Sequence, residues 1–215
     1  MPIRMNKHEQ HTPQTVELTA DLPARASRTT KSMAAVVGVG LFCLLTILGA
    51  MVRVPLPGTP VPMTLQTAVV LFAGVALGAR LGACSQLLYL AIGLAGVPVF
   101  ADSGAGPLAG PQYVFGATGG YLLGFLIVPI VVGRLTARSG GLKPAFAAAA
   151  VGTILIFALG VGWLAISTGS VWTALQQGLL PFWLGAVLKC GLVVAAGSVL
   201  GPTCRRVWRT GAVGH

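Results

Sequence analysis

The lysine at position 189 lies in the middle of the last long apolar run of the chain, residues 182–200. The chain has only four acidic residues, and three of them lie in its polar amino-terminal segment: Glu9, Glu17 and Asp21. A charged side chain at bilayer depth costs about 2.5–3.5 kcal/mol on insertion scales, and such a residue usually marks a functional site. We therefore interpret Lys189 as a partner for the carboxylate of a ligand. The alternative is a lysine whose ammonium group extends to the membrane surface.

Two polar side chains stand at the start of another apolar run, directly after a proline-rich segment. Residues 55–62 contain four prolines, which exclude a helix and predict a stiff loop. Gln66 has an amide that both donates and accepts hydrogen bonds, so it suits a heterocyclic or amide-like ligand. Its alternative role is a hydrogen bond between helices. Thr64 is a ligand contact or the N-cap of the helix that follows.

Glycines, aromatic residues and one acid complete the set of candidate ligand contacts. Gly119 and Gly120 open an apolar run, where they allow the backbone to approach a ligand or allow tight helix packing. Aromatic residues near the outer half of the bundle either anchor at the membrane interface or wall a pocket: Tyr89, Phe100, Tyr113, Tyr121, Phe125, Phe182 and Trp183. For Asp102 three roles are open, namely a ligand contact, an ion pair with Arg53 or Lys189, or solvation in a loop.

The elements that position these residues are membrane helices. The chain has 215 residues, of which 55% are hydrophobic and 8% are charged, whereas soluble domains have about 25% charged residues. Apolar runs lie at 34–52, 65–79, 82–97, 119–133, 144–168 and 178–200. Since a membrane helix needs about 20 residues, and shorter runs can borrow flanking residues, we expect an all-α, polytopic membrane protein with six transmembrane helices surrounded by membrane lipid.

The basic residues indicate the orientation of these helices. If both termini are cytoplasmic, every Lys and Arg falls in a cytoplasmic segment except Arg53 and Lys189, as the positive-inside rule requires. The net charge of +10 is thus explained by topology, and no nucleic-acid partner is expected. We divide the chain into a disordered polar cytoplasmic tail (1–33), a six-helix membrane domain (34–204) and a short basic cytoplasmic tail (205–215). The outer connections are then the proline-rich loop, residues 97–118 and residues 167–177.

Catalytic and metal chemistry find no support in the sequence. All three histidines lie in the terminal segments, and the four cysteines show no paired spacing, so neither a metal site nor a cofactor is expected. No nucleophile has a plausible base, which argues against an enzyme. The membrane domain also lacks the intramembrane acids that proton-coupled carriers usually need.

Several motifs together resemble the BioY family of biotin transport proteins. They are residues 54–66 (VPLPGTPVPMTLQ), 77–82 (LGARLG), 88–101 (LYLAIGLAGVPVFA), 116–125 (GATGGYLLGF) and 180–182 (LPF), together with Lys189. The resemblance implies a substrate-binding S-component of an energy-coupling factor transporter in the bacterial cytoplasmic membrane. Its ligand would be biotin, and its partners would be a transmembrane T-component and ATPase subunits. Ala34 and Gly38 resemble the small-residue surface that contacts the T-component.

The chain departs from the family pattern beside Lys189. The family usually has an acidic residue one helical turn before this lysine, and here that residue is Ala186. A milder difference is Ala117, where the family usually has proline. The first difference motivates an alternative ligand, which would be a related small anion such as a biotin precursor or another vitamin. A non-transporting membrane scaffold is the third hypothesis.

Overall fold

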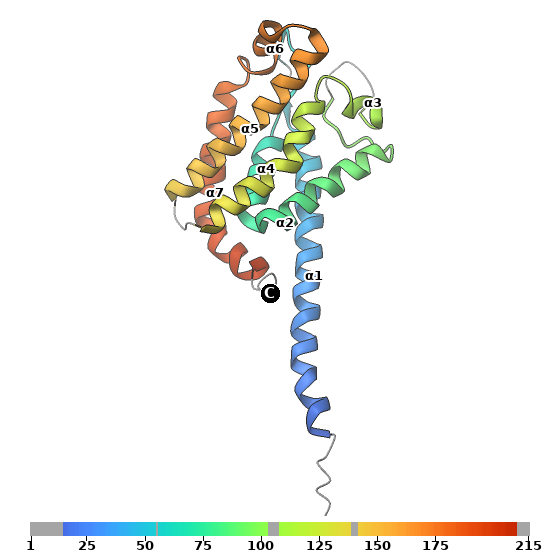
Figure 1. The fold of residues 1–215 in the computed structure, drawn as a ribbon, viewed down its shortest axis with the longest axis vertical. Helices are drawn as coiled ribbons and strands as arrows, with labels where there is room; N and C mark the ends of the chain where they lie inside the picture. Colours follow the sequence, from blue (N-terminus) through green and yellow to red (C-terminus); the bar gives the residue numbers. More distant parts are fainter. Residues whose placement is uncertain (1–14, 55, 103–107, 139–141, 210–215) are drawn as a thin grey trace, which may run out of the picture.

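The computed structural model describes residues 15–54, 56–102, 108–138 and 142–209, and most of them are helical (Figure 1). In chain order the elements are α1 (Thr15–Met51), β1 (Arg53–Val54), β2 (Met63–Thr64), α2 (Gln66–Leu94), α3 (Pro111–Val114), α4 (Gly119–Arg138), α5 (Leu142–Thr168), α6 (Val171–Gly178) and α7 (Trp183–Arg209). The mainly helical prediction is confirmed, with one correction. The strands β1 and β2 pair antiparallel, so the proline-rich segment connects a short hairpin instead of forming a simple loop.

Four of the described helices are long and apolar enough to cross a membrane, namely α1, α2, α4 and α5. Helices α6 and α7 are apolar enough only as a pair, which is bent by 52° and would give a fifth span. A bilayer core needs about 20 residues of helix. The chain is therefore a multi-pass membrane protein.

Helix α2 contains two of the predicted apolar runs and is broken at Gly78. This glycine has φ 80° and ψ −177°, a conformation that side chains with a Cβ atom rarely adopt. The two apolar runs are therefore joined by a break at a single residue, because the helix resumes directly after the glycine. Gly133 of α4 packs so closely on the break that a Cβ atom there would collide with the backbone of Ala79.

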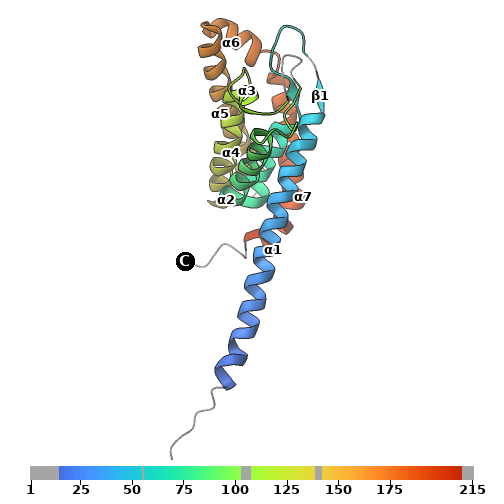
Figure 2. The same cartoon turned by 90° about the vertical axis from the view of Figure 1, so that its right-hand side faces the viewer.

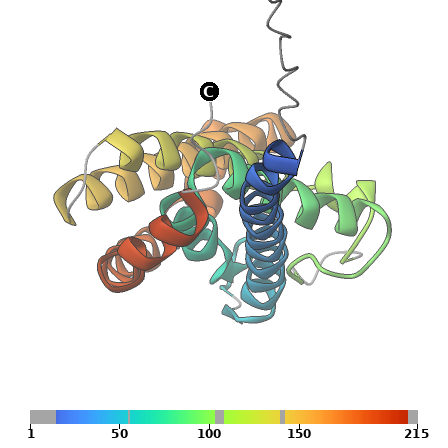
Figure 3. The same cartoon turned by 90° about the horizontal axis from the view of Figure 1, so that it is seen from below.

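The two halves of α2 lie at the centre of the bundle. Helix α2 contacts α1 and α7 as well as α4, and α5 packs on both α4 and α7. Figure 3 shows α4 and α5 on one side of α2, with α1 and α7 on the other. Buried residues of α2 and α4 form the middle of the core, among them Val70, Leu71, Val128 and Val132. In this packing, residues of α2, α4, α5 and α7 surround one space.

Three predicted segment assignments and one predicted boundary need correction. Helix α1 begins at Thr15, so residues 15–33 are helical and not a disordered tail, and Figure 2 shows this part extending beyond the bundle. Each residue added to an existing helix gains a hydrogen bond, which favours such an extension. Residues 1–14 lie outside the described residues. The other two corrections are α3 and α6, which lie in connections expected to lack secondary structure. Helix α7 also runs past the predicted boundary at residue 204 to Arg209.

Candidate functional site

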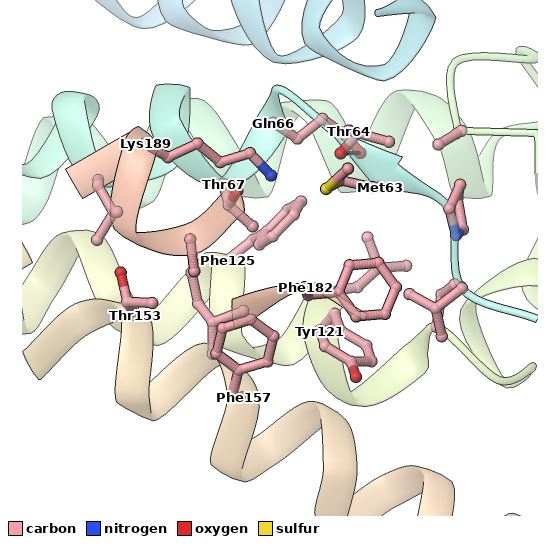
Figure 4. Close-up of a pocket in the computed structure, with 18 of the residues that line it drawn as sticks. Met63, Thr64, Gln66, Thr67, Tyr121, Phe125, Thr153, Phe157, Phe182 and Lys189 are labelled. Carbon is pink, nitrogen blue, oxygen red and sulfur yellow. Dashed lines mark hydrogen bonds between the residues drawn. The ribbon is translucent and has the colours of Figure 1, made fainter. Parts of the chain in front are cut away.

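A cavity opens among the hairpin, α2, α4, α5 and α7, with about 720 Å³ of empty space including its mouth. Its walls are mostly apolar, and Figure 4 shows their side chains. The lining residues are Val61, Pro62, Met63, Thr64, Gln66, Thr67, Leu71, Ala101, Tyr113, Thr118, Tyr121, Leu122, Phe125, Thr153, Ile156, Phe157, Phe182, Ala186 and Lys189. Half of the predicted ligand contacts are among them: Thr64, Gln66, Tyr121, Phe182 and Lys189.

Lys189 projects from α7 into this cavity, as Figure 4 shows. Within the described part of the chain, its ammonium group has no hydrogen bond and no ion pair. Among the described residues no acid lines the cavity, and Ala186, one helical turn earlier on α7, lines the same wall. The cavity therefore presents a cation without a counter-charge from its own lining.

Gln66 is held by two hydrogen bonds at the start of α2. Its Nε2 atom donates to the Tyr89 hydroxyl oxygen at 2.7 Å, and its Oε1 atom accepts from the Thr64 hydroxyl at 3.3 Å. Gln66 lines the cavity, and its bond to Tyr89 joins the two halves of α2 on either side of Gly78, while its contact with a ligand stays a prediction. The N-cap role for Thr64 is wrong, because the N-cap residue of α2 is Leu65 and no side chain caps this helix.

Tyr89 and Phe100 lie behind the cavity wall and do not line the cavity. Tyr89 is fully buried, with its ring edge-on to Phe100 at 5.6 Å between centroids. Phe100 in turn stacks on the cavity-lining Tyr113 at 4.6 Å. Burial raises the pKa of Tyr113 to about 12, so its hydroxyl is a neutral donor and bonds the Ala101 carbonyl oxygen at 2.6 Å. Tyr89 and Phe100 therefore act on the site through Gln66 and Tyr113.

Gly119 and Gly120 serve helix packing and are not among the described residues that line the main cavity. A Cβ atom on Gly119 would lie 2.9 Å from Cε2 of Trp163, and one on Gly120 would collide with the Leu159 carbonyl. Trp163 is fixed in place because its indole N–H donates to the Gly116 carbonyl at 2.9 Å. Tight contact between α4 and α5 explains these glycines, and their role as ligand contacts stays a prediction.

Asp102 forms an ion pair with Arg53, and the Arg53 Nη1 atom also donates to the Asp102 carbonyl oxygen at 3.3 Å. The two residues line a separate hollow at the outer end of α1. Of the alternatives open for Asp102, the structure shows the pair with Arg53. Asp102 is not among the described residues that line the main cavity, and its role as a ligand contact stays a prediction.

The aromatic walls come from α4, α5 and the turn before α7. Tyr121, Phe125, Phe157 and Phe182 line the cavity, and the Tyr121 hydroxyl donates to the Gly178 carbonyl oxygen at 2.7 Å. Trp183, by contrast, is 60% exposed and does not line it. The outer segments are also tied together, since the Thr59 hydroxyl donates to the Gln177 carbonyl oxygen at 2.6 Å.

Comparison with known proteins identifies the BioY family, whose sequence profile matches residues 19–206. The chain belongs to the BioY family. One relative is the "Probable biotin transporter BioY" of Lysinibacillus sphaericus, with 33% identity over 84% of this chain and 91% of the relative. Another is the "Biotin transporter BioY" of Thermotoga maritima, with 34% identity over 76% of this chain and 92% of the relative.

The fold is similar to a crystal structure described as the S-component for biotin from an ECF-type ABC transporter. The TM-score is 0.71 at 24% sequence identity, over 81% of this chain and 92% of that chain. At this identity the similarity establishes the fold.

Sequence reasoning missed several cavity residues of this BioY-family protein. Thr67 lies directly after Gln66 in the recognised motif, and Thr153 and Phe157 share one face of α5 at i, i+4 spacing. This spacing was a usable signal, but the uniformly apolar α5 sequence does not tell which of its faces meets the cavity. Thr153 also contacts the Cys190 sulfur at 3.2 Å, next to Lys189.

The small-residue pair on α1 has a mixed environment. Gly38 is buried within the protein and Ala34 is half-buried, whereas the neighbouring Val36 and Val37 are 69% and 61% exposed. The contact of this pair with a T-component remains a prediction for the BioY-family chain.

Proposed function

We propose that this BioY-family protein is a biotin-binding S-component that captures the vitamin from the outer side of the membrane and mediates its uptake. The observation that carries the proposal is the Lys189 ammonium group in an apolar cavity without an acidic lining residue. Biotin has a carboxylate for this lysine, a ureido ring for Gln66 and an apolar ring for the aromatic walls. The names of two relatives, both biotin transporters, support the same ligand.

The proposed topology has six transmembrane helices with both termini in the cytoplasm. The break at Gly78 supports this count, because it divides α2 into two helices that would cross separately. With α1, α4, α5 and α7 they make six. The basic residues support the orientation through the positive-inside rule, and the protein would reside in the bacterial cytoplasmic membrane.

We further propose that uptake uses an ATP-driven energy-coupling module, with a T-component and ATPase subunits. The support is chemical, since the cavity lining contains no acidic residue that could couple transport to protons. Biotin uptake by cells that express the protein with and without the module measures this dependence. Equal uptake in both strains would contradict the coupling.

Direct binding tests the ligand assignment. Purified protein in detergent is titrated with biotin by calorimetry, and uptake of radiolabelled biotin is measured in cells that depend on external biotin. We expect binding at micromolar concentration or below, and accumulation above the background of cells with an empty vector. Absence of binding at micromolar biotin would overturn the proposal.

A second ligand class is favoured by one observation, which is Ala186 in the cavity wall. Because this position lacks an acid, the cavity would also suit another small anion, such as a biotin precursor that retains the carboxylate. A competition panel of biotin, its precursors and other anionic vitamins ranks these candidates. A precursor that binds at least tenfold more tightly than biotin would replace biotin as the assigned ligand.

A further inference from the structure

One buried hydroxyl group of the cavity has no hydrogen-bond partner. The Oγ1 atom of Thr67 is buried, yet among the described residues nothing bonds to it. Threonines in other helices donate to the carbonyl oxygen four residues earlier: Thr46 to Phe42 at 2.8 Å, Thr136 to Val132 at 2.9 Å and Thr168 to Leu164 at 2.8 Å. Leaving a buried hydroxyl unpaired costs about 1–3 kcal/mol, so Thr67 needs an explanation.

The position of Thr67 explains why the usual partner is missing. It is the second residue of α2, so the residue four positions earlier is Met63, which belongs to strand β2 and not to the helix. The same helix end has no side-chain cap, because its N-cap residue is Leu65. An uncapped helix N-terminus carries a partial positive charge and favours an anion.

Lys189 lies on the facing wall of the same cavity. Figure 4 shows the Lys189 side chain extending from α7 toward Thr67, with the Phe125 ring beside them. Both residues line the cavity, and neither has a partner among the described residues. A cation, an unpaired hydroxyl and a helix N-terminus therefore meet in one apolar region.

We propose that the Thr67 hydroxyl is a second anchor for the ligand carboxylate, which Lys189 and Thr67 hold between α7 and the start of α2. This inference rests on the proposed function, and it names the part of the ligand that this end of the cavity recognises. The hydroxyl oxygen is covered while the residue itself lines the cavity, so it reaches the ligand by rotation about χ1. The bound carboxylate then accepts a hydrogen bond that the protein alone does not provide.

This arrangement makes Thr67 a determinant of specificity for an anion. A hydrogen bond to a charged acceptor is stronger than one to a neutral acceptor, and the apolar surroundings strengthen it further. A neutral ligand of the same shape would gain less from both Lys189 and Thr67. The effect of Thr67 should therefore appear in the ratio of affinities for a carboxylate ligand and a neutral analogue.

The test compares the full-length parent with Thr67→Val and Thr67→Ser, and uses Thr136→Val as a matched control. Thr136 is a buried helical threonine that does not line the cavity. Calorimetry gives Kd for biotin and for biotinol, in which a CH₂OH group replaces the carboxyl group. We expect Thr67→Val to weaken biotin binding about tenfold, as for loss of a charge-assisted hydrogen bond, and to weaken biotinol binding by less than about threefold. Thr67→Ser and Thr136→Val should stay near the parent.

A double-mutant cycle with Lys189→Met checks whether the two residues hold the same group. We expect the loss from Thr67→Val to shrink when Lys189 is already replaced, because both act on one carboxylate. An unchanged biotin affinity in Thr67→Val, or equal losses for biotin and biotinol, would overturn the inference. A parent protein that fails to bind biotin would instead overturn the proposed function. The melting temperature of each variant verifies folding, and Thr67→Val should be at least as stable as the parent.

Discussion

Replacing Lys189 with methionine distinguishes the effect of this cation on the stability of the membrane domain from its effect on ligand affinity. Methionine keeps most of the length and apolar volume of the lysine stem, and it removes the charge. In the parent, the ammonium group lines an apolar cavity and has no ion-pair partner among the described residues. We expect Lys189→Met to lose biotin affinity while its fold is retained or stabilised.

The expected magnitudes follow from the environment of the lysine. A hydrogen bond to a charged group contributes about 1.5–3 kcal/mol, and each 1.4 kcal/mol changes Kd about tenfold. Biotin binding should therefore weaken by about 100-fold, at the upper part of this range, because the walls around the pair are apolar. Removing an uncompensated cation should raise stability by about 1 kcal/mol, which corresponds to about 2–4 °C in melting temperature for a chain of this size.

Calorimetry with biotin and biotinol, together with a thermal unfolding scan, measures both effects. Lys143→Met is the matched control, because Lys143 is exposed at the start of α5 and does not line the cavity. It should leave both ligand affinities unchanged. The carboxylate role of Lys189 would be refuted if Lys189→Met bound biotin as tightly as the parent, or if the parent bound biotin and biotinol equally.

Three further substitutions test other parts of the site. Ala186→Asp places a carboxylate one helical turn from Lys189. Because the new acid competes with the ligand for the lysine, we expect the preference for biotin over biotinol to fall about tenfold. An unchanged ratio of the two Kd values would contradict this. Gly160→Ala puts a methyl group into the Tyr121 ring, and a loss of about 1–3 kcal/mol of stability is expected from overpacking, visible as a lower melting temperature. Gln66→Leu leaves the Tyr89 hydroxyl without its buried partner. We therefore expect stability to fall by about 1–3 kcal/mol and biotin binding, measured by calorimetry, to weaken. A variant with the stability and the biotin affinity of the parent would argue against the role of Gln66.

The residues that could be located from sequence are those whose chemistry conflicts with their surroundings. Lys189 and Gln66 are polar side chains in or beside long apolar runs, and such a conflict is rare enough to indicate a cavity. Gly78 lies at the end of the short apolar run 65–79, close to the start of the next run at residue 82. In each case a local pattern carried the information, and the structure places the lysine and the glutamine in the cavity lining.

The residues that could not be assigned depend on which way a helix face turns. Gly119 and Gly120 looked like ligand contacts, but they pack against Trp163 because α5 covers that side of α4. Nothing in the α4 sequence specifies this neighbour. Thr67 was missed for a related reason, since an unpaired hydroxyl is recognised only when its surroundings are known. These assignments depend on contacts between segments that are distant in the sequence. Such contacts cannot be predicted from the periodicity within one segment.

Asp102 pairs with Arg53, and this bears on the partner of Lys189. The chain has one acid in its hydrophobic part, and that acid is held by Arg53 at the outer end of α1. Arg53 lies in β1, and Thr64, opposite it on β2, is bonded to Gln66. The ion pair therefore joins the loop that carries Asp102 to the hairpin, whose Thr64 lines the cavity. Because Arg53 pairs with Asp102, and no acid is among the described residues of the cavity lining, we expect the carboxylate for Lys189 to come from the ligand.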